Sequence, residues 1–482
     1  YSDDNNIAQL AIYDNQTLYK DIIRVLISDS AHKNKVHQEL NMLCHGPYTV
    51  KQLSGNEALE FEFDRGDKIT FRPSQAGIEL HSNGKLLATA ANRWHIVDQN
   101  TEIIDILDIQ REFTKNSNTG TPYKGNFEIS KGDGGLILIN EIAIEEYLSS
   151  VVTSEMPVSF GLEALKVQAI CARAYAIASL GRAGFASYGA HLDDSTASQM
   201  YNNTIEHPTA LSAVQSTKGI VPFYEDEIVD TRFFSTSPGY TASSSEVWSH
   251  SDGTFPGVEI PYLLARPQYT GDSPSLHNNE NFRAFIDNVN NTSYDRFSPF
   301  FRWSVEFSRE ALEASINENL SKVQVQQPKF VLTRVGNTYH EDIPIPEDIG
   351  SPPNIAVIAR GHGGNIMELE LSTTSGNYRV RKELNIRNVL KPINYIGSEP
   401  IELKCHDGSI RENFPLLPSA FAYIDILRDS DGNIAHVTIT GGGYGHGVGM
   451  SQYGTYGLTL LGKTFNEILE HYYPGCQLKQ IY

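Results

Sequence analysis

The sequence is poor in positive charge and contains no long apolar run. Its 482 residues include 38 Lys and Arg against 58 Asp and Glu, a formal net charge of −20. This balance argues against nucleic acid as a partner, because binding a polyanion needs positive charge that displaces counterions. The longest apolar run is far shorter than the roughly 18 residues that suggest a membrane-spanning helix. The chain is therefore predicted to contain no transmembrane segment.

Cysteine is also scarce, and its spacing excludes two small-domain classes. The four cysteines stand at Cys44, Cys171, Cys405 and Cys476, and no two form a C-x-x-C pair. Neither a zinc knuckle nor a disulfide framework is indicated. The chain starts at Tyr1 rather than at Met, which is consistent with removal of a signal peptide.

The hydrophobic pattern predicts an α+β fold with a β-rich beginning. Residues 22–27 form a β-branched run, and residues 59–63 alternate between apolar and charged side chains, as strands do. From Leu162, small or apolar residues recur every three or four positions, which is typical of one face of an amphipathic helix. A capping box that begins at Thr464 predicts the start of a final helix.

One carboxylate stands out in the segment Ser154-Glu155-Met156-Pro157. Pro157 disfavours helical geometry at Met156, so the backbone is predicted to turn there. Apolar neighbours favour partial desolvation of the Glu155 carboxyl, a condition that a general acid needs near neutral pH. Composition alone leaves an alternative open, in which Glu155 serves the N-terminus of the following helix, where acidic side chains are favoured.

A second segment, 441–454, contains seven glycines in fourteen residues. Missing side chains let the backbone approach a ligand closely. The interleaved Tyr444, His446 and Gln452 offer stacking and hydrogen-bonding groups that suit an uncharged polar chain such as a sugar. The alternative is a tight strand-to-helix connection that needs glycine only for packing.

Two further patterns match known motifs without the structural context that those motifs need. Residues 457–464 fit the phosphate-loop pattern G-x-x-x-x-G-K-[ST], but apolar residues there fall on one helical face and no buried strand precedes them. His32 and His37 have a spacing found in zinc sites, yet no C-x-x-C or zincin helix accompanies them. We interpret them as part of a polar surface turn.

Six segments, in order along the chain, resemble the sporulation stage II protein D and LytB amidase-enhancer (SpoIID/LytB) family. They are 140–157, 163–176, 191–201, 234–241 followed by 246–248, 445–454 and 471–475. The resemblance covers about 125–270 and 355–480. It predicts four regions: a β-rich N-terminal region at 1–124, the first part of a catalytic core at 125–268, an inserted subdomain at 269–350, and the second part of the core at 351–482.

The resemblance implies a lytic transglycosylase of peptidoglycan, which cleaves the MurNAc–GlcNAc bond and leaves a 1,6-anhydro-MurNAc end. It places the catalytic acid, and then base, at Glu155. The residues expected to contact the glycan are Gln199, Tyr201, Ser235, Thr236, Ser237, His446 and Gln452. We expect sugar to bind in a groove between the Glu155 and His446 loops.

The resemblance also predicts what surrounds the reaction. Some family members bind zinc near the D-S-T-x-x-Q segment, but Asp193, Ala197 and Ser198 occupy that stretch here, so we predict no metal and no cofactor. Pro238 replaces a usual glycine, which affects the local backbone. The expected location is extracytoplasmic, wall-associated or secreted, with any signal or anchor absent from this chain.

Two other functions remain open at this stage. One is a cell-wall binding protein that enhances a partner N-acetylmuramoyl-L-alanine amidase without cleaving anything itself. The other is a structural sporulation factor held by partner proteins. The intact Glu155 favours the enzyme, whereas Pro238 and the extra regions favour a repurposed binder.

Overall fold

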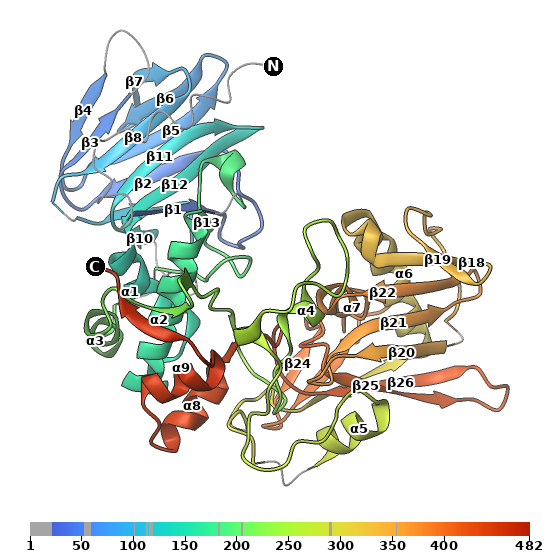
Figure 1. Cartoon of the computed structure of the whole chain (residues 1–482). Helices are drawn as coiled ribbons and strands as arrows, with labels where there is room; N and C mark the ends of the chain where they lie inside the picture. Colours follow the sequence, from blue (N-terminus) through green and yellow to red (C-terminus); the bar gives the residue numbers. More distant parts are fainter. Residues whose placement is uncertain are drawn as a thin grey trace. The chain divides into compact units, whose positions relative to one another are not determined.

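The computed structural model describes residues 22–52, 59–100, 102–111, 114, 119–181, 184–203, 206–288, 292–352 and 354–482. Contacts divide the chain into two compact units, Tyr1–Asp230 with Gln477–Tyr482, and Thr231–Cys476 (Figure 1). The boundary predicted near 124 falls inside the first unit, and the region predicted as an insertion falls inside the second. Helices and several sheets make up both units, so the predicted α+β class is confirmed.

Two large sheets fill the first half of the first unit. Their strands are β1 (Ile22–Ile27), β2 (Leu40–Cys44), β3 (Tyr48–Lys51), β4 (Glu60–Phe63), β5 (Lys68–Ser74), β6 (Gly77–Ser82), β7 (Lys85–Ala90), β8 (Arg93–Asp98), β9 (Ile104–Ile106), β10 (Thr121–Tyr123), β11 (Asn126–Gly132), β12 (Gly135–Ala143) and β13 (Leu192–Asp193). One sheet has the order β13-β1-β12-β11-β8-β3-β4, and the other β10-β9-β2-β5-β6-β7. The buried indole of Trp94 on β8 donates to the Ile78 carbonyl on β6 at 2.9 Å and so joins the two sheets.

Helices and a small sheet complete the first unit. They are α1 (Ile144–Glu155), η1 (Val158–Phe160), α2 (Leu162–Ser179), η2 (Ala186–Tyr188), α3 (Pro208–Ser216), β14 (Ile220–Tyr224), β15 (Glu227–Ile228) and β28 (Gln477–Gln480). The helix predicted from Leu162 is confirmed as α2. It begins after Gly161, whose φ of +90° favours glycine. The C-terminal strand β28 pairs with β14, which lies more than 250 residues earlier in the chain.

A partly buried ion pair fastens α2 to the start of α1. The guanidinium of Arg173 is fully buried and donates to both carboxylate oxygens of Glu145, at 2.7 and 2.8 Å. It also donates to the carbonyls of Ile220 and Val214. Burial alone raises the pKa of Glu145, but the hydrogen bonds and charge of Arg173 hold it below its ordinary value. Arg173 therefore holds the fold by joining α1, α2 and the segments that contain Val214 and Ile220.

Substitution of Arg173→Met should lower the free energy of unfolding by about 3 kcal/mol, because it leaves Glu145 without its charged partner in a buried setting. Urea denaturation followed by circular dichroism measures the loss. The control is Lys166→Met. It removes a partly exposed ion pair on the same helix, in which the Lys166 ammonium lies 2.7 Å from the Glu163 carboxylate. Its loss should lower the free energy of unfolding by less than about 1 kcal/mol. Equal losses for the two variants would contradict the assignment.

The second unit contains the remaining elements. They are β16 (Phe233–Phe234), α4 (Ser244–Val247), η3 (Pro261–Leu263), α5 (Asn279–Asp287), β17 (Trp303–Ser308), α6 (Arg309–Gln326), η4 (Pro328–Phe330), β18 (Val331–Val335), β19 (Thr338–His340), β20 (Asn354–Arg360), β21 (Ile366–Ser372), β22 (Asn377–Arg381), α7 (Glu383–Val389), β23 (Glu402–Cys405), β24 (Ile410–Glu412), β25 (Ala422–Arg428), β26 (Ile434–Gly441), β27 (Met450–Ser451), α8 (Gln452–Leu460) and α9 (Phe465–Tyr472).

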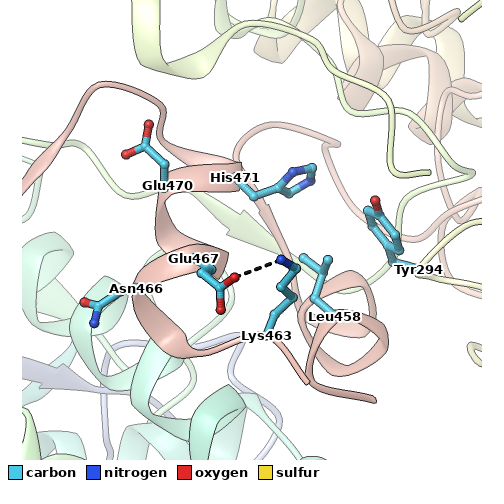
Figure 2. Close-up of a pocket in the computed structure, with 7 residues that line it drawn as sticks. All are labelled: Tyr294, Leu458, Lys463, Asn466, Glu467, Glu470 and His471. Atoms are coloured by element: carbon cyan, nitrogen blue, oxygen red, sulfur yellow. Dashed lines mark hydrogen bonds and ion pairs between the residues drawn. The ribbon is translucent and has the colours of Figure 1, made fainter. Parts of the chain in front are cut away.

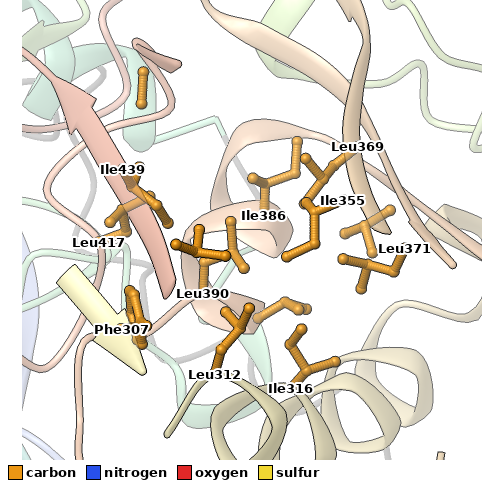
Figure 3. Packing of buried hydrophobic residues seen from close by; sticks show 14 of the residues in the cluster. Phe307, Leu312, Ile316, Ile355, Leu369, Leu371, Ile386, Leu390, Leu417 and Ile439 are labelled. Carbon is orange, nitrogen blue, oxygen red and sulfur yellow. The ribbon is translucent and has the colours of Figure 1, made fainter. Parts of the chain in front are cut away.

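Two five-stranded sheets and two helices share the core of this unit. The sheets have the orders β24-β23-β17-β26-β25 and β19-β18-β22-β21-β20. Leu312 of α6 and Ile386 of α7 belong to one apolar cluster with Leu371 of β21 and Ile439 of β26 (Figure 3). Because β17 comes from the predicted insertion and pairs with β26, the insertion is part of this core rather than an appendage.

Two findings bear on the earlier expectations from composition. All four cysteines are free thiols in this structure. Among the described helices, none combines the length and the apolar character needed to cross a membrane. The capping box predicted at Thr464 is confirmed, and it starts α9 as expected.

Candidate functional site

Glu155, the predicted acid, is the last residue of α1 and is half-buried. Its Oε1 accepts a hydrogen bond of 2.6 Å from the backbone N–H of Met200. The chain turns where predicted, because Met156 has extended backbone angles before Pro157. The helix α2 begins only at Leu162, after η1 and Gly161. Glu155 thus ends one helix and lies seven residues before the first residue of the next.

Ser154, the residue before Glu155, contacts the same segment that supplies the Met200 amide. The backbone N–H of Asn202 donates to Ser154 Oγ at 3.2 Å, and the Ser154 hydroxyl donates to the Ser150 carbonyl at 2.8 Å. The apolar residues near Glu155 in the sequence are all buried: Val151, Val152 and Met156. The half-buried Glu155 thus ends a helix with a buried apolar side, and its carboxyl has a fixed hydrogen-bond donor in the Met200 amide.

Gln199 and Tyr201 flank Met200 in this segment and are fully buried. The Gln199 amide donates to the Ala172 carbonyl at 3.3 Å, and the Tyr201 hydroxyl donates to Asn140 Oδ1 at 2.9 Å. The Tyr201 ring packs on Tyr147, with 4.9 Å between ring centres. Buried side chains have no surface to offer a ligand, so the predicted glycan contacts of these two residues are not confirmed. They support the segment that carries Met200.

The D-S-T stretch, predicted to lack zinc, is occupied by ion pairs. Asp193 and Asp194 are buried, and they pair with Lys35 and Arg111 respectively. Within the described ranges, no three or more His, Cys, Asp or Glu side chains gather as metal ligands do. The predicted absence of zinc stays a prediction.

The turn predicted at His32 and His37 is only partly a surface feature. His37 is buried, and its ring nitrogen Nε2 lies 2.8 Å from the Ile27 carbonyl. His32 is one-fifth exposed and contacts the segment that follows Tyr201. The interpretation as a plain polar surface turn was therefore wrong for His37.

The other predicted residues belong to the second unit, where two motif segments interlock. Strand β16 pairs in parallel with β27, and a bridge joins Thr236 to Tyr444. Thr236 and Ser237 are buried, Gln452 is 8% exposed at the start of α8, and Ser235 and His446 are half-buried. Since Glu155 lies in the first unit, the groove expected between it and His446 stays a prediction.

Asp295 joins these two segments and is fully buried. It accepts hydrogen bonds from the Ser237 backbone N–H at 2.8 Å and from the Ser237 hydroxyl at 2.7 Å. The Ser451 hydroxyl donates to the same carboxylate. Burial raises the pKa of Asp295 to about 6, although these hydrogen bonds act to lower it. Asp295 is therefore a titratable group at the centre of the interlocked segments.

The raised pKa of Asp295 predicts that its contribution to stability depends on pH. The value in the folded state lies above the ordinary 3.8, so the folded state binds the proton more tightly. The contribution is full below about pH 4 and is lost as pH rises through about 6. From pH 4 to 7, wild type should lose on the order of 3 kcal/mol more unfolding free energy than Asp295→Asn.

Urea denaturation of both proteins at several pH values measures this difference. Asparagine approximates the neutral acid and does not titrate, so it cancels the contributions of all other groups. Parallel stability curves for the two proteins would show that Asp295 does not titrate in this range.

His446 sits against two aromatic rings. Its ring centre lies 5.6 Å from that of Phe234 and 5.2 Å from that of Trp248. The backbone N–H of Val448 donates to His446 Nδ1 at 3.1 Å. Because Nδ1 accepts, the proton of the neutral ring resides on Nε2, which is then a hydrogen-bond donor.

In the glycine-rich loop, two glycines are needed because other parts of the protein pack closely against them. A Cβ on Gly449 would lie 2.1 Å from the Arg232 carbonyl oxygen, and one on Gly447 would lie 2.5 Å from the Phe421 ring. Both residues have positive φ angles, +77° and +87°. The alternative in which these glycines serve a tight strand-to-helix connection is thus supported.

A cavity of about 490 Å³ lies elsewhere in the second unit (Figure 2). It is lined by Tyr294, Leu458, Lys463, Asn466, Glu467, Glu470 and His471. The ammonium of Lys463 is 2.8 Å from Glu467, and Thr464 caps α9. The residues that resembled a phosphate loop therefore form helix ends with an internal ion pair, which agrees with rejection of a nucleotide site.

Three residues important to these sites were missed by sequence reasoning. Asp295 lies in a polar stretch of the predicted insertion, and Arg111 lies in the poorly matching N-terminal region. His32 was examined only as a possible zinc ligand. No local spacing distinguishes them, because each meets its partners only through contacts between distant parts of the chain.

Comparison with known proteins finds relatives that agree with the predicted resemblance to the SpoIID/LytB family. The family model for SpoIID, described as a stage II sporulation protein, matches residues 132–224. The chain is 27% identical over 337 residues to the amidase enhancer of Bacillus subtilis (strain 168), which covers 69% of this chain and 40% of that protein. It is 26% identical over 356 residues to stage II sporulation protein D of the same strain. That match covers 71% of this chain and 76% of the relative. The match thus spans less than half of the enhancer's length.

Proposed function

We propose that this chain, whose predicted resemblance to the SpoIID/LytB family is confirmed by the comparisons, is a lytic transglycosylase of peptidoglycan. The observation that carries the proposal is the setting of Glu155. Its carboxyl is half-buried beside apolar residues and is held at one oxygen by the Met200 amide at 2.6 Å. A general acid needs such a fixed, partly desolvated carboxyl within reach of its substrate.

A single carboxyl suffices for this reaction. Protonated Glu155 donates its proton to the glycosidic oxygen as the bond from C1 of MurNAc breaks. The resulting carboxylate removes the proton of the C6 hydroxyl of the same sugar, whose oxygen then bonds to C1. The acid is regenerated and no water is consumed, so the second carboxylate of an ordinary glycosidase is not needed.

The position of Glu155 supports both halves of this cycle. It ends α1, and the Met200 N–H holds one of its oxygens in place. The same fixed carboxyl can therefore act first as the acid and then, without moving, as the base. This substrate also implies an extracytoplasmic location.

Replacement of Glu155→Gln should lower the yield of 1,6-anhydro-MurNAc ends by at least about 10³-fold, since glutamine cannot transfer the proton. Denuded glycan strands are digested, and the products are identified by mass spectrometry. The control Glu163→Gln removes a nearby carboxylate whose partner is Lys166, and it should leave the yield within about twofold. Undiminished product from the Glu155 variant would refute the proposed acid.

The second candidate is an amidase enhancer. It is favoured by the relative of that name, which matches 69% of this chain, and by the burial of five of the seven predicted glycan contacts: Gln199, Tyr201, Thr236, Ser237 and Gln452. An enhancer would release no anhydro ends, yet would raise the rate of an added N-acetylmuramoyl-L-alanine amidase. That rise would persist in the Glu155→Gln variant.

A further inference from the structure

The segment that supplies Met200 is held by the N-terminal strands. Residues 192–193 form β13, which pairs in parallel with β1 through Val25–Leu192 and Leu26–Asp193. The N–H of Asp194 then donates to the Leu26 carbonyl at 3.2 Å. All of these N-terminal partners precede residue 132, where the match to the family model begins.

A buried carboxylate holds the middle of the segment. Asp194 is fully buried and accepts hydrogen bonds from Arg111 and from both the backbone N–H and the hydroxyl of Ser28. Arg111 also donates to the Ser28 carbonyl at 3.1 Å. Burial alone raises the pKa of Asp194, but His32 and Arg111 hold it below its ordinary value. This carboxylate fixes the turn between β13 and Met200.

His32 reaches the far end of the same segment. Its Nε2 lies 3.2 Å from Asn202 Oδ1, and its Nδ1 lies 3.3 Å from the Ser28 hydroxyl and 3.6 Å from the Asp194 carboxylate. The amide oxygen of Asn202 can only accept, so Nε2 donates. The Asn202 backbone N–H in turn donates to Ser154, next to Glu155.

The backbone at His32 indicates that the ring position is specifically maintained. His32 has φ of +56°, a left-handed conformation that is uncommon for residues with a Cβ. Such conformations persist where the surrounding structure requires them, and they often occur at functional positions. Glycine or asparagine would adopt this angle more readily.

We propose that His32, acting through Asn202, is a positioning residue that keeps the Met200 amide on the Glu155 carboxyl. The proposal rests on the proposed function, because Glu155 is the acid there. It assigns the N-terminal β region an indirect part in the reaction. His32 touches no reacting atom and acts only through the segment 199–202.

The test uses His32→Asn in the full chain, because asparagine suits the left-handed backbone but is too short to replace the ring. Urea denaturation checks that the variant is folded under the assay conditions. Its kcat should fall about fivefold to tenfold, the effect of one lost hydrogen bond, while KM stays within about twofold. The control Lys33→Ala changes an exposed neighbour in the same loop and should alter neither constant.

Amide hydrogen exchange gives a readout that does not depend on activity. Exchange at Met200 and Asn202 should be about fivefold to tenfold faster in His32→Asn than in wild type. Asn202→Ala provides a second route and should accelerate exchange at Met200 similarly. Unchanged exchange in both variants would overturn the proposal, as would faster exchange with unchanged kcat in an active protein.

Failure of the proposed function gives a different pattern. Wild type would then release no anhydro ends, while the exchange rates at Met200 and Asn202 would still decide whether His32 holds the segment. A positive exchange result in an inactive protein would support the positioning of Glu155 and would refute only its role as the acid.

Discussion

The hydrogen bond from the Met200 amide to the Glu155 carboxyl is the interaction on which the candidate site of the first unit depends. It joins the end of α1 to a segment that returns to it from more than forty residues later in the chain. The Met200 amide fixes the position of one carboxylate oxygen. Three features hold the segment that supplies this amide: the Asn202 contact with Ser154, the burial of Gln199 and Tyr201 on either side of Met200, and the bonds of Asp194.

In the second unit, too, a carboxylate joins segments that are distant in the sequence, but its partners there include serine hydroxyls. A buried carboxylate, Asp295, binds two serines from separate motifs, Ser237 and Ser451. The hydroxyls of these motifs are therefore engaged within the protein, and the glycines of the loop are packed against neighbouring backbone. The serines and glycines of these motifs, which suggest ligand binding in the sequence, therefore serve here mainly to hold two segments of the chain together. His446, beside Trp248, is the part that keeps some exposure.

Local patterns predicted the regular elements well, because those elements follow from periodicity and capping. The β-branched run at 22–27 is β1, the repeat from Leu162 is α2, and the capping box at Thr464 starts α9. The turn at Met156 before Pro157 was also predicted, since proline restricts the residue that precedes it. The side chains assigned to glycan binding were predicted less well. Polarity alone cannot distinguish a serine or glutamine on a surface from one that satisfies a buried partner.

The sequence by itself determined the α+β class, the order of the motifs, the resemblance to SpoIID/LytB proteins and the choice of Glu155, because these depend on residues close together in the chain. Tertiary structure alone decided which groups surround that carboxyl. Met200 and Asn202 come from one distant segment, and His32 and Arg111 come from two others that hold it. Their partners are selected by sheet pairing and by the need to satisfy buried charge, and neither requirement leaves a mark in local spacing.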